Sequence, residues 1–276
     1  MIELEDLCGL PILFDPETYE LRSARPGWEL PEPGIRTLDE MRPVLMDPTC
    51  DGPEIVYWMY RDICLPEDSH LRREYGLRYD ISVFRGDMFG PEYFKTAGHY
   101  HPYIHWKYPL SWPEVYEVLY GEAIYVLQYV DDIYKDPYYV EVKDFVVVHA
   151  KPGRQVVMPP NYGHVTINPN PGRPLVMANW VCDWFRSYYK SVEEARGYCY
   201  YRVRGEKSEP KWVPNPMYKQ PLPTIREAKA VDVEELGLVE GQPMYRRCAG
   251  NPRLFEWVCR PQDHLDKIWA QLDLQQ

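Results

Sequence analysis

The sequence lacks the features of a membrane, secreted or general nucleic-acid-binding protein. In its 276 residues no apolar run approaches the roughly 20 residues that span a bilayer. The N-terminus reads MIELED and does not have the basic and then apolar segments of a signal peptide. The 31 Lys and Arg are outnumbered by 42 Asp and Glu, which gives a formal charge of −11 and no basic excess for nucleic acid or anionic lipid. We therefore expect a cytoplasmic protein that binds neither nucleic acid nor membrane.

Paired cysteines are also absent. The seven cysteines are dispersed and odd in number, and no two of them form a C-x-x-C pair. Neither a zinc ribbon nor a redox motif is indicated. In a reducing compartment, isolated cysteines of this kind act as small buried hydrophobic residues.

Glycine is scarce compared with proline and tyrosine, and this composition indicates a mostly β protein. There are 17 glycines, 28 prolines and 24 tyrosines. Proline ends helices and marks turns, whereas tyrosine favours strands and pocket walls. Short apolar segments follow one another at the spacing of a barrel or sandwich, with turn signals between them and no long helical period: 79–85, 93–95, 115–119, 123–130, 145–148, 154–158, 165–168 and 175–181.

The chain divides into four predicted parts. Residues 1–50 are expected to form N-terminal strands that pack on a barrel, and residues 51–205 the barrel itself. Residues 206–223 are a proline-rich linker. Residues 224–276 form a C-terminal extension, in which apolar residues at i, i+3, i+4 and i+7 predict an amphipathic helix: Leu265, Ile268, Trp269 and Leu272.

Three of the seven histidines fall in two compact motifs that predict a metal site. The first motif contains His99 and His101 and is followed by Glu114, and the second places His164 after the turn at 159–161. Alternate residues of a strand share a face, so His99 and His101 project together. Three imidazoles and one carboxylate suit Mn²⁺, Fe²⁺, Ni²⁺ or Zn²⁺ and leave two octahedral positions open. The other histidines lack this context and are interpreted as surface or structural residues: His70, His105, His149 and His264.

These motifs, T-x-G-H-x-H…E-V-Y and P-P-x-x-x-H-x-x-x-N, resemble those of the archaeal-type, cupin-fold glucose-6-phosphate isomerases. The resemblance extends over roughly residues 10–218. It implies an all-β cupin double-stranded β-helix, or jelly roll, with a small and partly helical C-terminal extension. It also implies a homodimer with one divalent metal ion per subunit, bound by the four residues of the two motifs: His99, His101, Glu114 and His164.

The resemblance assigns roles to further residues. Tyr116 matches a tyrosine that reaches into the substrate pocket. The candidates for proton transfer are Glu114, and Tyr116 or Glu117 acting through water, although strand alternation should point Glu117 away from Glu114. Ser82, Thr96 and Gly98 match the positions that hold the substrate phosphate through hydroxyl and backbone groups, with serine at a position where the family usually has threonine.

Other positions depart from the family pattern. Trp180 stands where the family has a phosphate-contacting tyrosine, and Arg186 falls near a family histidine. Trp180 and Arg186 are therefore candidate substrate-binding residues. Arg186 or Lys95 could pair with an anion through its cationic head group. Additional aromatic residues within 103–112 are expected to form a loop beside the pocket mouth.

The resemblance implies that the protein interconverts glucose 6-phosphate and fructose 6-phosphate, and that the reaction passes through an open-chain form of the sugar bound to the metal. A metal ion acting as a Lewis acid supports either proton transfer or a hydride shift between C1 and C2. A first rival function is the same chemistry on another anionic hexose, such as a 6-sulfonated sugar. A second is that of a metal-dependent cupin oxygenase or decarboxylase, and a third is that of a non-catalytic sugar- or metal-sensing module.

Overall fold

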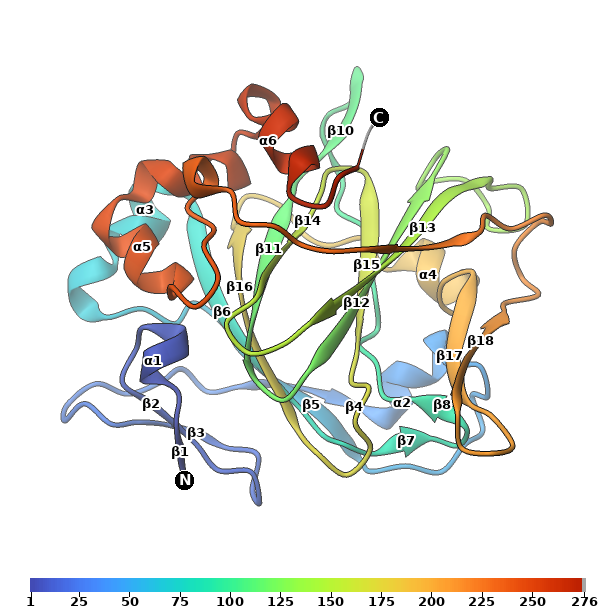
Figure 1. Cartoon of the computed structure of the whole chain (residues 1–276), viewed down its shortest axis with the longest axis horizontal. Coiled ribbons are helices and arrows are strands. Elements are labelled where there is room, and N and C mark those ends of the chain that lie inside the picture. The colour runs from blue at the N-terminus through green and yellow to red at the C-terminus, as the bar shows by residue number, and fades with distance from the viewer. Residues whose placement is uncertain (275–276) are drawn as a thin grey trace.

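A computed structural model describes residues 1–274 of the chain. Its centre is formed by two sheets that face each other (Figure 1). The larger sheet has six strands in the order β14-β11-β16-β6-β5-β4: β14 (Gln155–Met158), β11 (Glu114–Tyr120), β16 (Leu175–Cys182), β6 (Leu77–Phe84), β5 (Ile55–Tyr60) and β4 (Gly34–Thr37). The smaller has four in the order β15-β12-β13-β19: β15 (Tyr162–Ile167), β12 (Ala123–Val130), β13 (Val142–Ala150) and β19 (Ile225–Ala228).

The strands of the two sheets alternate along the chain. β11 belongs to the larger sheet, β12 and β13 to the smaller, β14 to the larger, β15 to the smaller and β16 to the larger. Neighbouring strands pair antiparallel except β13 and β19, which pair parallel. This connection pattern is that of a jelly roll. The protein is therefore an all-β cupin barrel, as the sequence predicts.

Three smaller sheets surround this barrel within the described residues. An N-terminal sheet contains β1 (Ile2–Glu3), β2 (Ile12–Phe14) and β3 (Leu21–Ser23). A second sheet contains β18 (Pro210–Pro214), β17 (Tyr200–Arg204), β8 (Glu92–Tyr93) and β7 (Met88–Phe89). A hairpin contains β9 (Tyr103–His105) and β10 (Tyr108–Ser111). It occupies the segment where the sequence predicts a loop.

The helices are short and lie outside the barrel (Figure 1). The α-helices are α1 (Glu5–Cys8), α2 (Leu38–Met41), α3 (His70–Tyr75), α4 (Lys190–Glu194), α5 (Met244–Gly250) and α6 (Leu265–Ala270). The 3-10 helices are Arg42–Val44, Pro66–Asp68, Glu234–Leu236, Pro252–Val258 and Pro261–Asp263. Across residues 1–274, no helix has the length and apolar character needed to cross a membrane.

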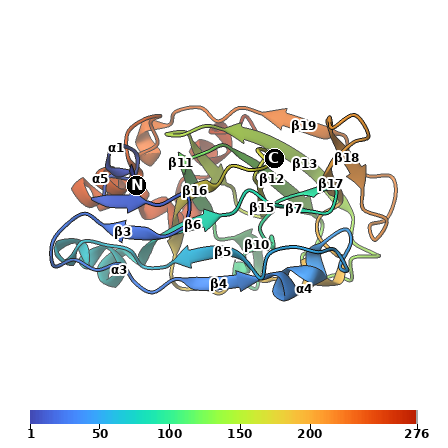
Figure 2. The ribbon, with the colours of Figure 1, turned by 90° about the horizontal axis from the view of Figure 1, so that it is seen from below.

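Segments flanking the barrel each add a strand to it. β4 pairs with β5 at the edge of the larger sheet, and β19 pairs with β13 at the edge of the smaller one. Figure 2 shows these two edges on opposite sides of the molecule. The proline-rich strand β18 is also an edge strand, where a missing backbone N–H is tolerated. The predicted helix near the C-terminus exists as a 3-10 turn followed by α6, and it buries Ile268 and Trp269.

Both faces of the larger sheet are buried, and each supports a different core. On β6, Tyr79 and Ile81 point outward into a core that also contains Phe255 of the C-terminal extension. Phe84 points to the inside of the barrel, and Asp80 and Ser82 line a cavity there. Because side chains alternate along a strand, the inner face of this sheet supplies every second residue to the cavity.

Candidate metal centre

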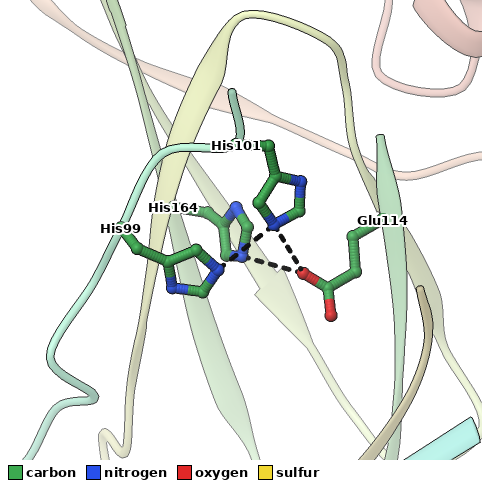
Figure 3. Close-up of side chains that lie close together, drawn as sticks. All are labelled: His99, His101, Glu114 and His164. Carbon is green, nitrogen blue, oxygen red and sulfur yellow. Dashed lines mark hydrogen bonds and ion pairs between the residues drawn. The ribbon is translucent and has the colours of Figure 1, made fainter. Parts of the chain in front are cut away.

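Four side chains that are distant in sequence converge inside the barrel: His99, His101, Glu114 and His164 (Figure 3). One ligand atom from each lies within 4.8 Å of the others. The backbones of His99 and His164 form an isolated antiparallel bridge, with N···O distances of 3.2 and 3.0 Å. The segment carrying His99 and His101 is thus held against β15 by single bridges instead of a regular strand, yet the two imidazoles converge as predicted.

Glu114 and His164 are brought together by paired loops as well as by strands. Glu114 begins β11, and His164 lies near the start of β15. Three residues before each of them, Ser111 and Asn161 exchange two hydrogen bonds. The Ser111 backbone N–H donates to Asn161 Oδ1 at 2.9 Å, and the Asn161 N–H donates to Ser111 Oγ at 2.7 Å. Asn161 has a φ of +70°, which asparagine tolerates better than most residues.

Neighbouring groups orient the ligands. His101 Nδ1 lies 2.8 Å from the carbonyl oxygen of Trp112 and donates to it, since a carbonyl can only accept. This fixes the tautomer that directs the lone pair of His101 Nε2 toward the centre. Asn179 Nδ2 donates to Glu114 Oε1 at 2.7 Å, which leaves Oε2 facing the imidazoles.

The electrostatics keep the cluster in the protonation states that metal binding needs. Burial, followed by the nearby imidazoles of His164 and His101, lowers the pKa of His99 well below its usual range. Burial also lowers the pKa of His164, although Glu114 opposes this change. Burial alone would raise the pKa of Glu114, but the adjacent imidazoles of His101 and His164 hold it far below its usual range. Glu114 is therefore ionised, and His99 and His164 are neutral, at neutral pH.

The donor set fits a divalent cation. Glu114 Oε2 is buried and has no aligned hydrogen-bond donor, although it lies 3.1 Å from His164 Nε2 and 3.3 Å from His101 Nε2. The Nε2 atoms of His99 and His101 face each other at 3.2 Å. Lone pairs that point to one centre at these separations are stabilised by a shared cation, and imidazole with carboxylate suits first-row divalent metals.

The metal cluster opens into a cavity along the inner face of the larger sheet. On β11, Tyr116 lies beside Glu114, and on the two neighbouring strands Asn179 and Ser82 face the same space. Tyr116 Oη is 3.5 Å from His164 Nε2. Burial raises the pKa of Tyr116 well above its usual value, so its hydroxyl stays protonated and can donate a hydrogen bond.

A sequence model described as glucose-6-phosphate isomerase (GPI) matches residues 35–217, which include all four residues of the cluster. The chain belongs to the glucose-6-phosphate isomerase family. No curated protein matches the sequence.

Solved structures with similar folds are distant from this family member. The capsular polysaccharide assembling protein CapF from Staphylococcus aureus aligns at 13% identity and a TM-score of 0.33, over 57% of this chain and 32% of that one. Vicilin from Capsicum annuum aligns at 12% identity and a TM-score of 0.32, over 49% and 31%. An oxalate oxidase in complex with glycolate aligns at 13% identity and a TM-score of 0.30, over 41% and 46%. The chain thus covers less than half of each of these structures.

The cavity of this GPI-family protein contains most of the predicted substrate-binding residues. Ser82, Thr96, Gly98 and Tyr116 all line it. Gly98 has a φ of +74°, and a Cβ there would lie 3.3 Å from Val165 Cβ. Glycine therefore allows the backbone to turn between Thr96 and the histidines without strain.

The structure does not place Trp180 in the cavity. Its side chain is 1% exposed and stacks on Tyr245 of α5 at 5.8 Å, on the outer face of the larger sheet. Strand alternation explains this placement, because Asn179 and Val181, its neighbours on β16, are the residues that line the cavity. The family tyrosine position is therefore occupied by a side chain of the outer core.

The structure also does not place Arg186 or Lys95 in the cavity. Arg186 is exposed in the segment after β16, next to Ser187, which does line the cavity. Lys95 is buried and forms an ion pair with Glu92 at 2.5 Å in a separate small cavity. A lysine neutralised in this way is not available to a substrate anion.

Sequence reasoning missed three kinds of cavity residue. Asn179 orients Glu114, Tyr57 and Tyr189 form an aromatic wall, and Arg61 follows β5 at the cavity edge. The alternation of residues 57, 59 and 61 along β5 was a usable signal. It was hidden because this strand is apolar and partly buried on both faces.

The inserted hairpin of β9 and β10 lies next to the metal cluster. Tyr103 of β9 contacts the ring of Tyr134 at 5.7 Å. Below the hairpin, Phe185 stacks on Trp112 and lies 4.4 Å from the His101 ring. Aromatic side chains thus pack directly against the His101 ring.

Proposed function

We propose that the protein is a metal-dependent aldose–ketose isomerase that interconverts glucose 6-phosphate and fructose 6-phosphate. Three histidines and Glu114 converge at a cavity lined with hydroxyl groups, within the segment that matches the GPI family, and this convergence is the main support for the proposal. The identity of the metal, the cytoplasmic location and the homodimer stay predictions from the sequence.

His99, His101, Glu114 and His164 would hold the metal ion. When bound, such an ion supplies Lewis-acid polarisation of a sugar carbonyl and orients neighbouring oxygens. The ionised Glu114 contributes the only negative charge of the cluster. Together these four side chains would fix the reacting end of the sugar at one end of the cavity.

The remaining side chains of the cavity act on the substrate directly. The protonated Tyr116 hydroxyl beside the cluster can donate to a sugar oxygen near C1 or C2 and hold it in place. Thr96 and Ser82 offer hydroxyl groups farther along the cavity for the rest of the sugar. This polar lining favours a polyol over the apolar surroundings that an O₂-dependent cupin oxygenase would use.

Hydrogen transfer between C1 and C2 by proton transfer would require a base at the reacting carbons. Of the predicted candidates, Glu114 is ionised and could accept a proton, whereas Tyr116 stays protonated and is suited to donate a hydrogen bond. Glu117 is not a candidate, because it points to the opposite side of β11 and accepts hydrogen bonds from Gln155 and the Met244 N–H. A hydride shift would need neither group as a base.

A 6-sulfonated hexose is the second substrate candidate. With Trp180 in the outer core, the cavity lacks the tyrosine hydroxyl expected at that family position. A site with one hydrogen-bond donor fewer suits a sulfonate group, because a sulfonate carries one negative charge whereas a phosphate carries two. The same ligand cluster and Tyr116 would serve both substrates.

The test is to purify the full chain, load it separately with Mn²⁺, Fe²⁺, Ni²⁺ or Zn²⁺, and measure conversion of glucose 6-phosphate and of the sulfonated analogue. Glu114→Gln and His164→Ala should lose bound metal by elemental analysis and lose turnover. His149→Ala changes an exposed histidine of β13 and should retain both. Turnover without metal, or full turnover by the two cluster variants, would contradict the proposal.

A further inference from the structure

Two arginines line the cavity, and their surroundings differ. Arg78 is fully engaged. Its guanidinium donates to both carboxylate oxygens of Asp80 at 2.9 to 3.1 Å and to Asp183 at 2.7 Å. These two carboxylates neutralise its charge, so Arg78 is a structural part of the cavity wall.

Arg61 lacks such partners. Among the described residues, no carboxylate lies within 4.0 Å of its guanidinium, and its one polar contact is from Nη2 to the thioether sulfur of Met59 at 3.2 Å. A thioether is a weak acceptor, whereas a guanidinium carries five N–H donors. Arg61 is exposed at the cavity edge and therefore presents, to solvent and to a ligand there, a positive charge without a neighbouring carboxylate among the described residues.

The position of this charge is defined by its neighbours. Burial raises the pKa of Tyr57, Asp80 and Tyr189. In each case the charge of Arg61 opposes the rise, and Arg61 lines the same cavity as these three side chains. Asp80 does not cancel this charge, because it is already bound by Arg78.

The Arg61 side chain folds back along β5 toward the substrate-binding part of the cavity. Its contact residue Met59 pairs across the strands with Ser82 of β6. The strand order places β16 and β6 between β11 and β5, so Glu114 and the base of Arg61 are separated by three strand spacings, or about 14 Å. An open-chain sugar with a carbonyl at one end and an anion at the other can bridge this separation once the reach of the Glu114 and Arg61 side chains is included.

We propose that Arg61 binds the tetrahedral oxyanion of the substrate, the phosphate or sulfonate at the end of an open-chain sugar, and thereby sets the preference for anionic over neutral sugars. This inference rests on the proposed isomerase function for the rest of the ligand. A planar guanidinium pairs with such an oxyanion through two parallel hydrogen bonds. It supplies locally the attraction that the net charge of −11 does not.

A binding experiment tests the anion site apart from catalysis. Titration calorimetry of the metal-free full chain with inorganic phosphate, and separately with sulfate, should show binding that Arg61→Gln weakens about 10- to 100-fold. Arg61→Lys keeps the positive charge but not the planar guanidinium, so its anion affinity should lie between those of the wild type and Arg61→Gln. Arg73→Gln, an exposed arginine of α3, is the matched control and should bind as the wild type does.

A kinetic experiment on the metal-loaded chain tests the substrate role. Arg61→Gln should raise KM for glucose 6-phosphate about 10- to 100-fold. The kcat value should change less than about threefold, since the reacting end of the sugar is held elsewhere. Activity on unphosphorylated glucose should be unchanged, so the preference for the anionic sugar is lost.

The outcomes separate this inference from the proposed function. In one outcome the wild type isomerises the sugar, and Arg61→Gln is folded by circular dichroism but unchanged in KM and phosphate binding. This outcome overturns the role of Arg61 alone. Loss of phosphate binding in that variant, without wild-type turnover of any anionic sugar, supports the anion site and overturns the isomerase proposal. Absence of phosphate binding by the wild-type chain overturns the anion site.

Discussion

Asn179 donates a 2.7 Å hydrogen bond from its side-chain amide to Oε1 of Glu114 across the β11–β16 strand pair. The bond holds one carboxylate oxygen and leaves the other facing His101 and His164. Both side chains are buried at the wall of the cavity. Asn179 is thus the residue that determines how Glu114 is presented to a metal ion.

Asn179→Ala should weaken metal binding about 10- to 100-fold, the effect commonly seen when a partner of a metal ligand is removed. Competition with a chromophoric chelator measures the Kd of the wild type and the variant. Asn170→Ala is the control, because Asn170 lies in the loop between β15 and β16 and contacts Glu122 instead of the cluster. Equal metal affinity of the Asn179 variant and the wild type would show that Glu114 is oriented without this bond.

Trp180→Phe should lower the free energy of unfolding by about 1–3 kcal/mol, because it leaves a void in the outer core beside Tyr79 and Tyr245. Since Trp180 does not face the cavity, KM for the sugar substrate should stay within about twofold of the wild-type value. Urea denaturation and steady-state kinetics measure the two quantities. A large rise in KM with unchanged stability would place this side chain at the substrate after all.

Glu117→Gln should remove part of the pH dependence of stability. Burial raises the pKa of Glu117 to about 8 from 4.5, even though Gln155 and the Met244 N–H donate to its carboxylate. Between these two pH values the unfolded chain has released the proton while the folded protein keeps it. Raising the pH therefore stabilises the unfolded state, by at most about 1.4 kcal/mol per pH unit.

Denaturant unfolding of the wild type and Glu117→Gln at several pH values from 5 to 8 measures this difference. The wild type should lose stability as the pH rises, and the variant should lose less. Glu206→Gln, an exposed residue of the β17–β18 turn, should follow the wild type. Parallel curves for the wild type and Glu117→Gln would exclude a protonated Glu117 in the folded state.

Gln271→Ala should lower the free energy of unfolding by about 1–3 kcal/mol, because it leaves buried backbone groups without partners. The Gln271 amide accepts from the Val157 N–H at 3.2 Å and donates to the Gln155 carbonyl at 2.9 Å. It thus satisfies the free edge of β14 as a neighbouring strand would. Gln262→Ala, at an exposed position, serves as the control for urea unfolding. A neutral effect of Gln271→Ala would mean that water satisfies this edge.

The ligand set was readable from the sequence because its chemistry is local and its spacing is characteristic. His99 and His101 are neighbours in one extended segment, and Glu114 and His164 each follow a recognisable turn. The barrel class was equally readable, since proline and short apolar segments exclude long helices. The fold brings the four side chains of the two motifs together in one cluster.

The other residues that line the cavity could not be predicted from the sequence in the same way. The strand that carries Asn179 and Trp180 reads LVMANWVC and is buried on both faces, so its pattern does not show which alternate residues point inward. The strand pairing with β11 and β6 decides this, and it selects Asn179 instead of Trp180. The presence of an arginine likewise does not reveal whether its charge is already neutralised.

The sequence by itself determined the all-β class and the four residues of the candidate metal centre, because residue type and short-range spacing suffice for both. Only the tertiary structure decided which face of each doubly buried strand lines the cavity. It also decided that Arg78 is paired with carboxylates while Arg61 has none beside it in the part of the chain that the structure describes, and that Gln271 closes a barrel edge. Those properties depend on strand register and on contacts between distant segments, which no local pattern encodes.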